Sequence, residues 1–182
     1  MSWYSPMVTA EAEALPVSVQ TIKERCMIDT DQDDAVIEMM IREVIAVIEQ
    51  TCNLSIWPKT LAAQCDSWAD LQRLPDGPLR PGSTPAITYT QPDGQEVVLD
   101  PAAYRVRSDG LTACLFPLTR WPQAHGGAAI LVTYEVGFAE LPLDLRLGIV
   151  MRIAELYGNP ENRPADRVTD FDRLLVNWRR GA

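Results

Sequence analysis

Apolar residues recur at helical spacing in three parts of the chain, and this spacing predicts helices at residues 18–28, 32–52 and 142–157. In the second of these helices, the apolar residues three or four positions apart are Ile37, Ile41, Val44 and Ile48. Additional apolar residues lie beside that row, so we expect this helix to be buried on two sides. The second side faces either another layer of its own fold or a neighbouring subunit.

Between residues 57 and 138 the pattern changes to short runs rich in Val, Thr, Tyr and Ile, separated by Pro and Gly, which is typical of strands. The predicted strands are residues 60–68, 86–90, 96–99, 104–107, 111–116 and 128–138. The dipeptides at 93–94 and 109–110 are both Asp-Gly, a typical hairpin turn. Closely spaced strands joined by such turns indicate antiparallel pairing.

These elements predict an α+β protein that is mainly a helical bundle, with two N-terminal and two C-terminal helices and a central antiparallel β insertion. Residues 1–16 have little periodicity and are expected to form an N-terminal arm. We expect residues 17–163 to form the main domain, with the β insertion at 57–138. Residues 164–182 are expected to form a separate, amphipathic C-terminal helix.

The predicted C-terminal helix carries an apolar face that is a candidate docking surface for a partner protein. The candidate docking residues are Phe171, Leu174, Leu175, Trp178, Arg179 and Arg180. The four apolar ones recur at helical spacing, and the two arginines follow at the negative end of the helix dipole. A generic protein-binding module that acts through this face is therefore one hypothesis for function.

The chain of 182 residues has a formal net charge of -9, and its acidic residues are concentrated at the start. Through Asp70 there are 12 acidic and 4 basic residues, and after it 13 acidic and 12 basic residues. Tight nucleic-acid binding needs clusters of Lys and Arg, so it is not expected. An acidic wall that lets DNA pass remains compatible with this charge. No apolar run approaches membrane-spanning length, so no membrane contact is expected.

The segment MIDTDQDDAVIEMM, residues 27–40, resembles the start of a calcium-binding loop. Asp29, Asp31 and Asp33 match the first, third and fifth positions of that loop. However, Asp34 stands where the loop needs glycine, and Met40 stands where it needs a bidentate glutamate. The segment therefore fits better as a helix start, with Thr30 or Asp31 as the cap and the following aspartates near the positive end of the dipole.

Motifs for catalysis are weak, and we predict no catalytic, cofactor-binding or metal-binding residue. His125 is the single histidine, and neither a nucleophile motif nor a phosphate-binding glycine loop accompanies it. The four cysteines are far apart and are expected to be buried, reduced thiols. A small metal-dependent hydrolase that uses residues 29–34 or His125 is the alternative hypothesis.

Four phrases, in order, resemble the head-tail connector (head-tail adaptor) family of phages, prophages and gene transfer agents. They are VSVQTIKERCMIDTDQDDAVIEMMIREVIAVIEQTCN, WPKTLAAQCDSW, ITYTQPDGQEVVLDPAAYRV, and RWPQAHGGAAILVTYEVGFAELPLDLRLGIVMRIAELYGNPENR. The resemblance covers about residues 17–163. The C-terminal part that follows is variable in that family.

The resemblance implies a structural protein rather than an enzyme, without a cofactor. It implies a homo-oligomer, a dodecameric ring assembled in the host cytoplasm beneath the portal protein at the head-tail junction of a virion or phage-like particle. Such a ring extends the DNA channel, joins the capsid to stopper and tail proteins, and lets DNA pass without specific binding. The ring-interface candidates are Val36, Met40 and Val47, because a ring subunit packs on both of its neighbours.

Titration with Ca²⁺ or Zn²⁺, followed by thermal melting, separates the helix-start interpretation from the metal-binding alternative. We expect no shift in melting temperature, because only an ion that binds the folded chain raises it. The variant Asp31→Ala with Asp33→Ala is expected to lower helix stability through lost caps. A metal-induced rise that disappears in this variant would support the hydrolase alternative instead.

Overall fold

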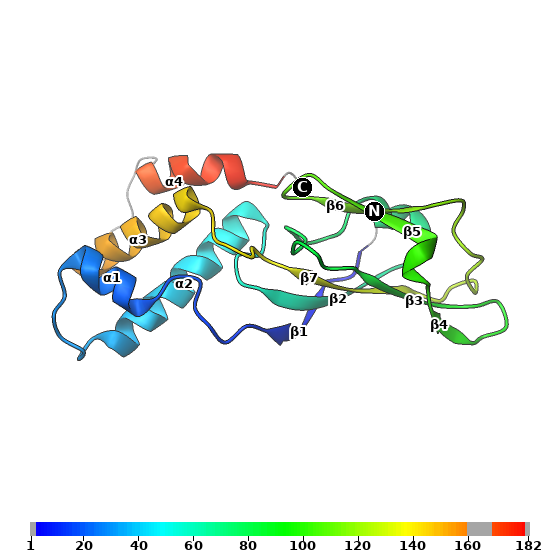
Figure 1. Ribbon diagram of the computed structural model, residues 1–182, viewed down its shortest axis with the longest axis horizontal. Coiled ribbons are helices and arrows are strands. Elements are labelled where there is room, and N and C mark those ends of the chain that lie inside the picture. Colours follow the sequence, from blue (N-terminus) through cyan, green and yellow to red (C-terminus); the bar gives the residue numbers. More distant parts are fainter. Residues whose placement is uncertain (1–2, 160–168, 181–182) are drawn as a thin grey trace. The chain divides into compact units, whose positions relative to one another are not determined.

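The computed structural model describes residues 3–159 and 169–180, and Figure 1 traces the chain. Its helices are α1 (Val19–Cys26), α2 (Asp34–Cys52), α3 (Leu143–Gly158) and α4 (Asp170–Leu175). Its strands are β1 (Met7–Glu11), β2 (Lys59–Cys65), β3 (Ala86–Thr90), β4 (Glu96–Val98), β5 (Tyr104–Ser108), β6 (Ala113–Pro117) and β7 (Ile130–Val136). Short 3-10 turns lie at Trp68–Gln72, Pro101–Ala103 and Val176–Trp178.

The chain divides into two compact units, each with its own internal packing. The β unit consists of residues 1–12 and 57–139, and the helical unit consists of residues 13–56 and 140–182. Each unit is therefore built from two segments that are distant in the sequence. No helix among the described residues is both long and apolar enough to cross a membrane.

The β unit contains two antiparallel sheets. The larger has the strand order β1-β2-β7-β3-β4, and the smaller is the β5–β6 hairpin. In the larger sheet, β2 pairs with β7 along its whole length, from Lys59 opposite Val136 to Cys65 opposite Ile130. Alternate residues of both strands are buried, which puts one face of the sheet on a hydrophobic core. Tyr134 is the largest of the fully buried side chains in that core.

Gly137, which directly follows β7, lies close to the backbone of Trp57 and Pro58. Its φ is 99°, and a Cβ atom built on it would lie 2.6 Å from the carbonyl oxygen of Trp57. The Trp57 indole in turn donates a hydrogen bond of 2.6 Å to the carbonyl oxygen of Ala12. Glycine is therefore needed at this position both for its backbone conformation and for the space it leaves.

The helical unit has a core formed mainly by α2 and α3. The buried residues of α2 are Ile37, Ile41, Val44, Ile45, Ile48 and Cys52. On α3, Leu145, Ile149 and Ile153 are fully buried at the same helical spacing. Ser18 caps α1, because its side chain accepts a hydrogen bond from the backbone N–H of Thr21.

The predicted fold class, mainly a helical bundle with a β insertion, is wrong. The described residues form four α-helices and seven strands in two antiparallel sheets. Residues 57–138 are not a small insertion, because they bury a hydrophobic core of their own. Long helices carry a stronger periodic signal than short strands, so periodicity overstates the helical share of this sequence.

Two of the expected boundaries also differ from the structure. Residues 7–11, expected within an N-terminal arm, form β1 and pair antiparallel with β2. Every residue of β1 is exposed, so the strand carries no alternating pattern by which it could be identified. The expected C-terminal helix at 164–182 begins in a segment that lies outside the described residues, and its described part consists of α4 and the 3-10 turn at Val176–Trp178.

Replacing Gly137 by alanine tests the close approach in the β unit. A residue with Cβ in a left-handed conformation costs about 1 to 2 kcal/mol, and Gly137→Ala must also displace the Trp57 backbone. Gly94→Ala is the matched control, because Gly94 has φ 89° and open space around it. We expect chemical denaturation to show a larger loss of stability for Gly137→Ala than for Gly94→Ala. Equal losses would contradict the steric account.

Candidate functional site

The acidic cluster at the start of α2 forms ion pairs with a lysine, Lys23. The ammonium group of Lys23 contacts the carboxylates of Asp31 and Asp34, with 2.9 Å between its Nζ and the Asp34 Oδ1. The Lys23 side chain is only 8% exposed, whereas that of Asp31 is 91% exposed. Hydrogen bonds to Asp31 and then Asp34 raise the pKa of Lys23, and the bond to Lys23 lowers the pKa of Asp31.

Asp33 joins the same cluster to α3. It is the N-cap residue of α2, but its side chain makes no capping hydrogen bond. Its Oδ2 instead accepts a hydrogen bond of 2.8 Å from the hydroxyl of Tyr157, and this bond raises the pKa of Tyr157. The expectation that Thr30 or Asp31 caps this helix is therefore wrong. The aspartates connect α1, α2 and α3 instead of capping one helix.

The structure does not bring the candidate metal ligands together. Among the described residues, no group of three or more His, Cys, Asp or Glu side chains is arranged to hold a metal ion. His125 is exposed on a loop, where its backbone N–H donates to the carbonyl oxygen of Thr90 at 2.8 Å. The cysteines are all free, with Cys52 and Cys65 buried. Burial raises the pKa of the Cys65 thiol to about 11.

The candidate docking face at the C-terminus packs on its own helical unit. Leu175 is 1% exposed, and the rings and methyl groups of Phe171 and Leu174 lie over Gly148 of α3. The Trp178 indole donates a hydrogen bond of 2.8 Å to the Asp144 carboxylate. This face therefore has an internal role, and its binding of an outside partner stays a prediction.

The two arginines that follow this face differ in exposure. Arg180 is buried, and its backbone N–H donates to the carbonyl oxygen of Cys52 at 2.8 Å. Arg179 is exposed. Of the two, Arg179 is therefore the one placed to meet a partner in the chain as described.

The ring-interface candidates lie on an uncovered side of α2. We call Val36, Met40, Glu43 and Val47 the outer stripe, since their spacing puts them in one row along the helix. Val36 is 41% exposed and Val47 is 52% exposed, while Met40 is half-buried. Val47 also borders a hollow of about 170 Å³ beside Leu156. Whether these residues form a ring interface stays a prediction.

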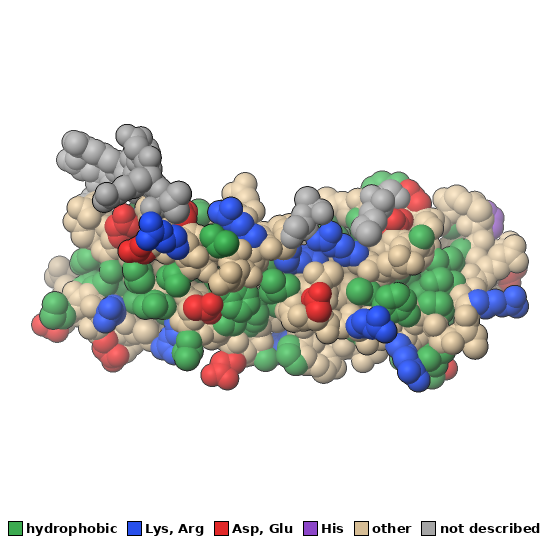
Figure 2. Space-filling view, turned by 90° about the horizontal axis from the view of Figure 1, so that it is seen from above, with side chains coloured by type: hydrophobic (Ala, Val, Ile, Leu, Met, Phe, Trp, Pro, Cys, Tyr) green, Lys and Arg blue, Asp and Glu red, His purple; other side chains and the backbone are tan. Residues whose placement is uncertain are grey.

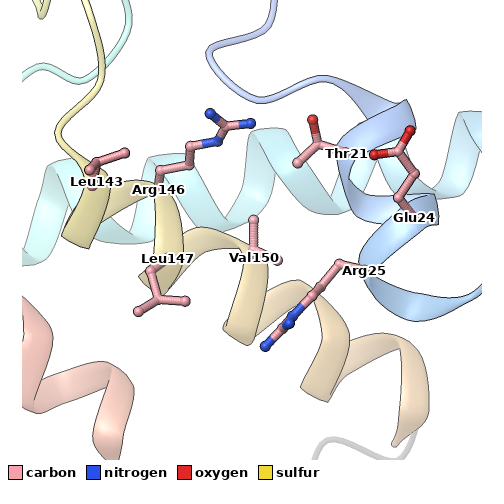
Figure 3. A pocket seen from close by; sticks show the side chains of 7 residues that line it. All are labelled: Thr21, Glu24, Arg25, Leu143, Arg146, Leu147 and Val150. Carbon is pink, nitrogen blue, oxygen red and sulfur yellow. The ribbon is translucent and has the colours of Figure 1, made fainter.

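A second apolar surface, which the sequence analysis missed, lies between α1 and α3 (Figure 3). We call it the α1–α3 groove. Its floor includes Leu147 and Val150, Leu143 lies at one end, and Arg25 and Arg146 border it. Its volume is about 510 Å³. Leu143 is 80% exposed and Leu147 is 45% exposed. The sequence does contain a sign of this surface, because Leu143 and Leu147 lie four positions apart and outside the buried row of α3.

The acidic surplus of the sequence does not gather into one patch on the face drawn in Figure 2. There, acidic and basic side chains alternate with patches of hydrophobic side chains. A continuous acidic wall is therefore not a feature of this face.

Comparison with known proteins confirms the family resemblance. Residues 16–80 match the model of the family described as "Phage gp6-like head-tail connector protein". This match includes α1, the acidic cluster and the whole of α2. No curated protein sequence matches the chain.

Solved structures with a similar fold come from gene transfer agent (GTA) particles. A chain of "Virion of native gene transfer agent (GTA) particle" has a TM-score of 0.78 at 18% identity, covering 98% of this chain and 97% of that one. A chain of "Neck of empty GTA particle computed with C6 symmetry" has a TM-score of 0.75 at 21% identity, with coverages of 97% and 96%. A chain of "Neck of native GTA particle computed with C12 symmetry" has a TM-score of 0.67 at 20% identity, with coverages of 97% and 96%.

The ion pair of Lys23 with Asp31 predicts a pH-dependent contribution to stability. Because the pKa of Asp31 is lowered in the folded chain, the contribution is present above the ordinary carboxyl value of about 3.9. It is lost as the pH falls through the lowered value. Asp31→Asn should therefore melt below wild type at neutral pH, and the difference should shrink in acid.

The control for this prediction is Asp29→Asn, which removes the charge of an exposed aspartate two residues away. Thermal melting of the three proteins across the acid range measures the effect. A difference for Asp31→Asn that is the same at every pH, or is matched by the control, would contradict the role of the ion pair.

Proposed function

We propose that this chain is a structural head-tail connector of a phage or phage-like particle. The observation that carries the proposal is the family match at residues 16–80, together with a fold shared over nearly the whole chain with chains of GTA neck structures. In the proposed role, copies form a ring below the portal, extend the DNA channel and present a surface to stopper or tail proteins.

The uncovered surfaces of the helical unit support a ring. A closed ring joins two different patches of each subunit, so every subunit needs two separate contact surfaces. The outer stripe and the α1–α3 groove are two such surfaces, and they share no lining residue. The ring symmetry of the neck structures, C6 and C12, is compatible with the dodecamer that the resemblance implies.

A structural role also fits the use of the polar residues in the helical unit. Asp31 and Asp34 bind Lys23, and Asp33 binds Tyr157, so the acidic cluster fixes helices to one another. The proposed role of this region is therefore to hold α1, α2 and α3 in a fixed arrangement. The metal-dependent hydrolase is the weaker candidate, and no observation in the described residues favours it.

Deleting the gene from a producing strain tests the proposed function. We expect filled heads without tails in electron micrographs, because the connection between portal and tail is missing. Expression of the wild-type chain from a plasmid should restore joined particles. A strain that still assembles normal joined particles without the chain would contradict the proposal, as would purified particles that lack the chain.

A further inference from the structure

Two apolar surfaces of the helical unit have no cover within the described residues. One is the outer stripe of α2, where Val36 and Val47 are 41% and 52% exposed. The other is the α1–α3 groove, where Leu143 and Leu147 are 80% and 45% exposed. Isolated exposed apolar side chains are common, but rows of them beside a hollow are typical of contact surfaces.

These surfaces lie on different sides of the helical unit. On α3, Leu145, Ile149 and Ile153 form a fully buried row, whereas Leu143 and Leu147 are exposed and turn away from that row. Figure 3 looks onto the groove with α2 behind α3. One copy of the chain can therefore use both surfaces at once, each toward a different neighbour.

A helix face and a groove between helices can fit together. The outer stripe is a row of side chains along one helix, and the α1–α3 groove is a hollow between two helices. An apolar helix face fits such a groove through residues spaced three or four positions apart. Val36, Met40, Glu43 and Val47 follow one another along α2 at intervals of four, three and four positions.

The groove is lined by two arginines and by one carboxylate, that of Glu24, which accepts a hydrogen bond of 3.0 Å from the Gln20 amide of the same helix. Arg25 and Arg146, which border the groove, are both exposed, and neither forms an ion pair with a described side chain. Glu43 lies in the outer stripe between Met40 and Val47, and it is likewise exposed without an ion pair among the described residues. A carboxylate in the stripe and guanidinium groups at the groove's border would orient the contact.

We infer that the outer stripe of one copy docks into the α1–α3 groove of the next copy, which makes this pair of surfaces the repeating contact of the proposed ring. The inference rests on the proposed function, because it names the contact by which that ring closes. The occupant of the groove is thus a second copy of this chain, joined head to tail.

Two single substitutions test this pairing. Val47→Asp puts a charge in the outer stripe, and Leu147→Asp puts one in the groove; both positions are exposed, so each variant should fold. Sedimentation over a series of concentrations should show assemblies for wild type and monomers for each variant. Val98→Asp, at an exposed position of β4, is the control and should assemble like wild type.

An equimolar mixture of the two variants gives the decisive result. Each variant keeps one intact surface, and together they have one complete pair, so the mixture should form 1:1 dimers and nothing larger. A symmetric contact of one surface with itself predicts no such rescue. Circular dichroism melting checks that both variants remain folded.

Three results would overturn the inference. These are a wild-type chain that stays monomeric throughout, folded variants that both assemble like wild type, and a mixture without dimers. The proposed function fails by a different result, namely joined particles that form without the chain. A chain found at the neck whose variants still assemble would therefore reject this contact and leave the connector role standing.

Discussion

The burial of α2 on one side only is the constraint on which the helical unit depends. Its inner residues, with those of α3, form the core, and the cluster at its start fixes α1 through Lys23 and α3 through Tyr157. Packing on α3 thus fixes the buried face of α2, and the acidic cluster fixes its N-terminal end. A second side of the helix carries the outer stripe, whose valines are exposed among the described residues, and a contact with another copy would cover them.

The acidic cluster shows how a sequence motif can be real and still be misread in detail. Its spacing excluded a complete calcium loop, because Asp34 and Met40 occupy two essential positions. Helix capping was the next simplest role for aspartates before an apolar run. Their partners are instead Lys23 and Tyr157, which lie 8 residues before Asp31 and 124 residues after Asp33. Tertiary contacts of this kind leave no local pattern in the sequence.

Periodicity predicted the helices and the strands that have a buried face, such as β2 and β7. The mostly exposed strands β4 and β5 were predicted from their composition and from the Asp-Gly turns beside them. Periodicity did not predict β1, whose residues are all exposed, nor the independent core of the β unit. Of the two candidate surfaces, likewise, only one could be predicted from the sequence. Val36 and Val47 could be selected as apolar residues outside the main buried row of α2, whereas the α1–α3 groove depends on how two helices pack and could not be derived from either helix alone.

In the proposed ring, this chain assembles through the outer stripe of α2. An electron cryo-microscopy reconstruction of the assembled chain, at a resolution that shows side chains, would show this contact. We predict a closed ring in which Val36, Met40 and Val47 of each copy are covered by α1 and α3 of its neighbour. A ring that leaves this side of α2 facing solvent would contradict the claim.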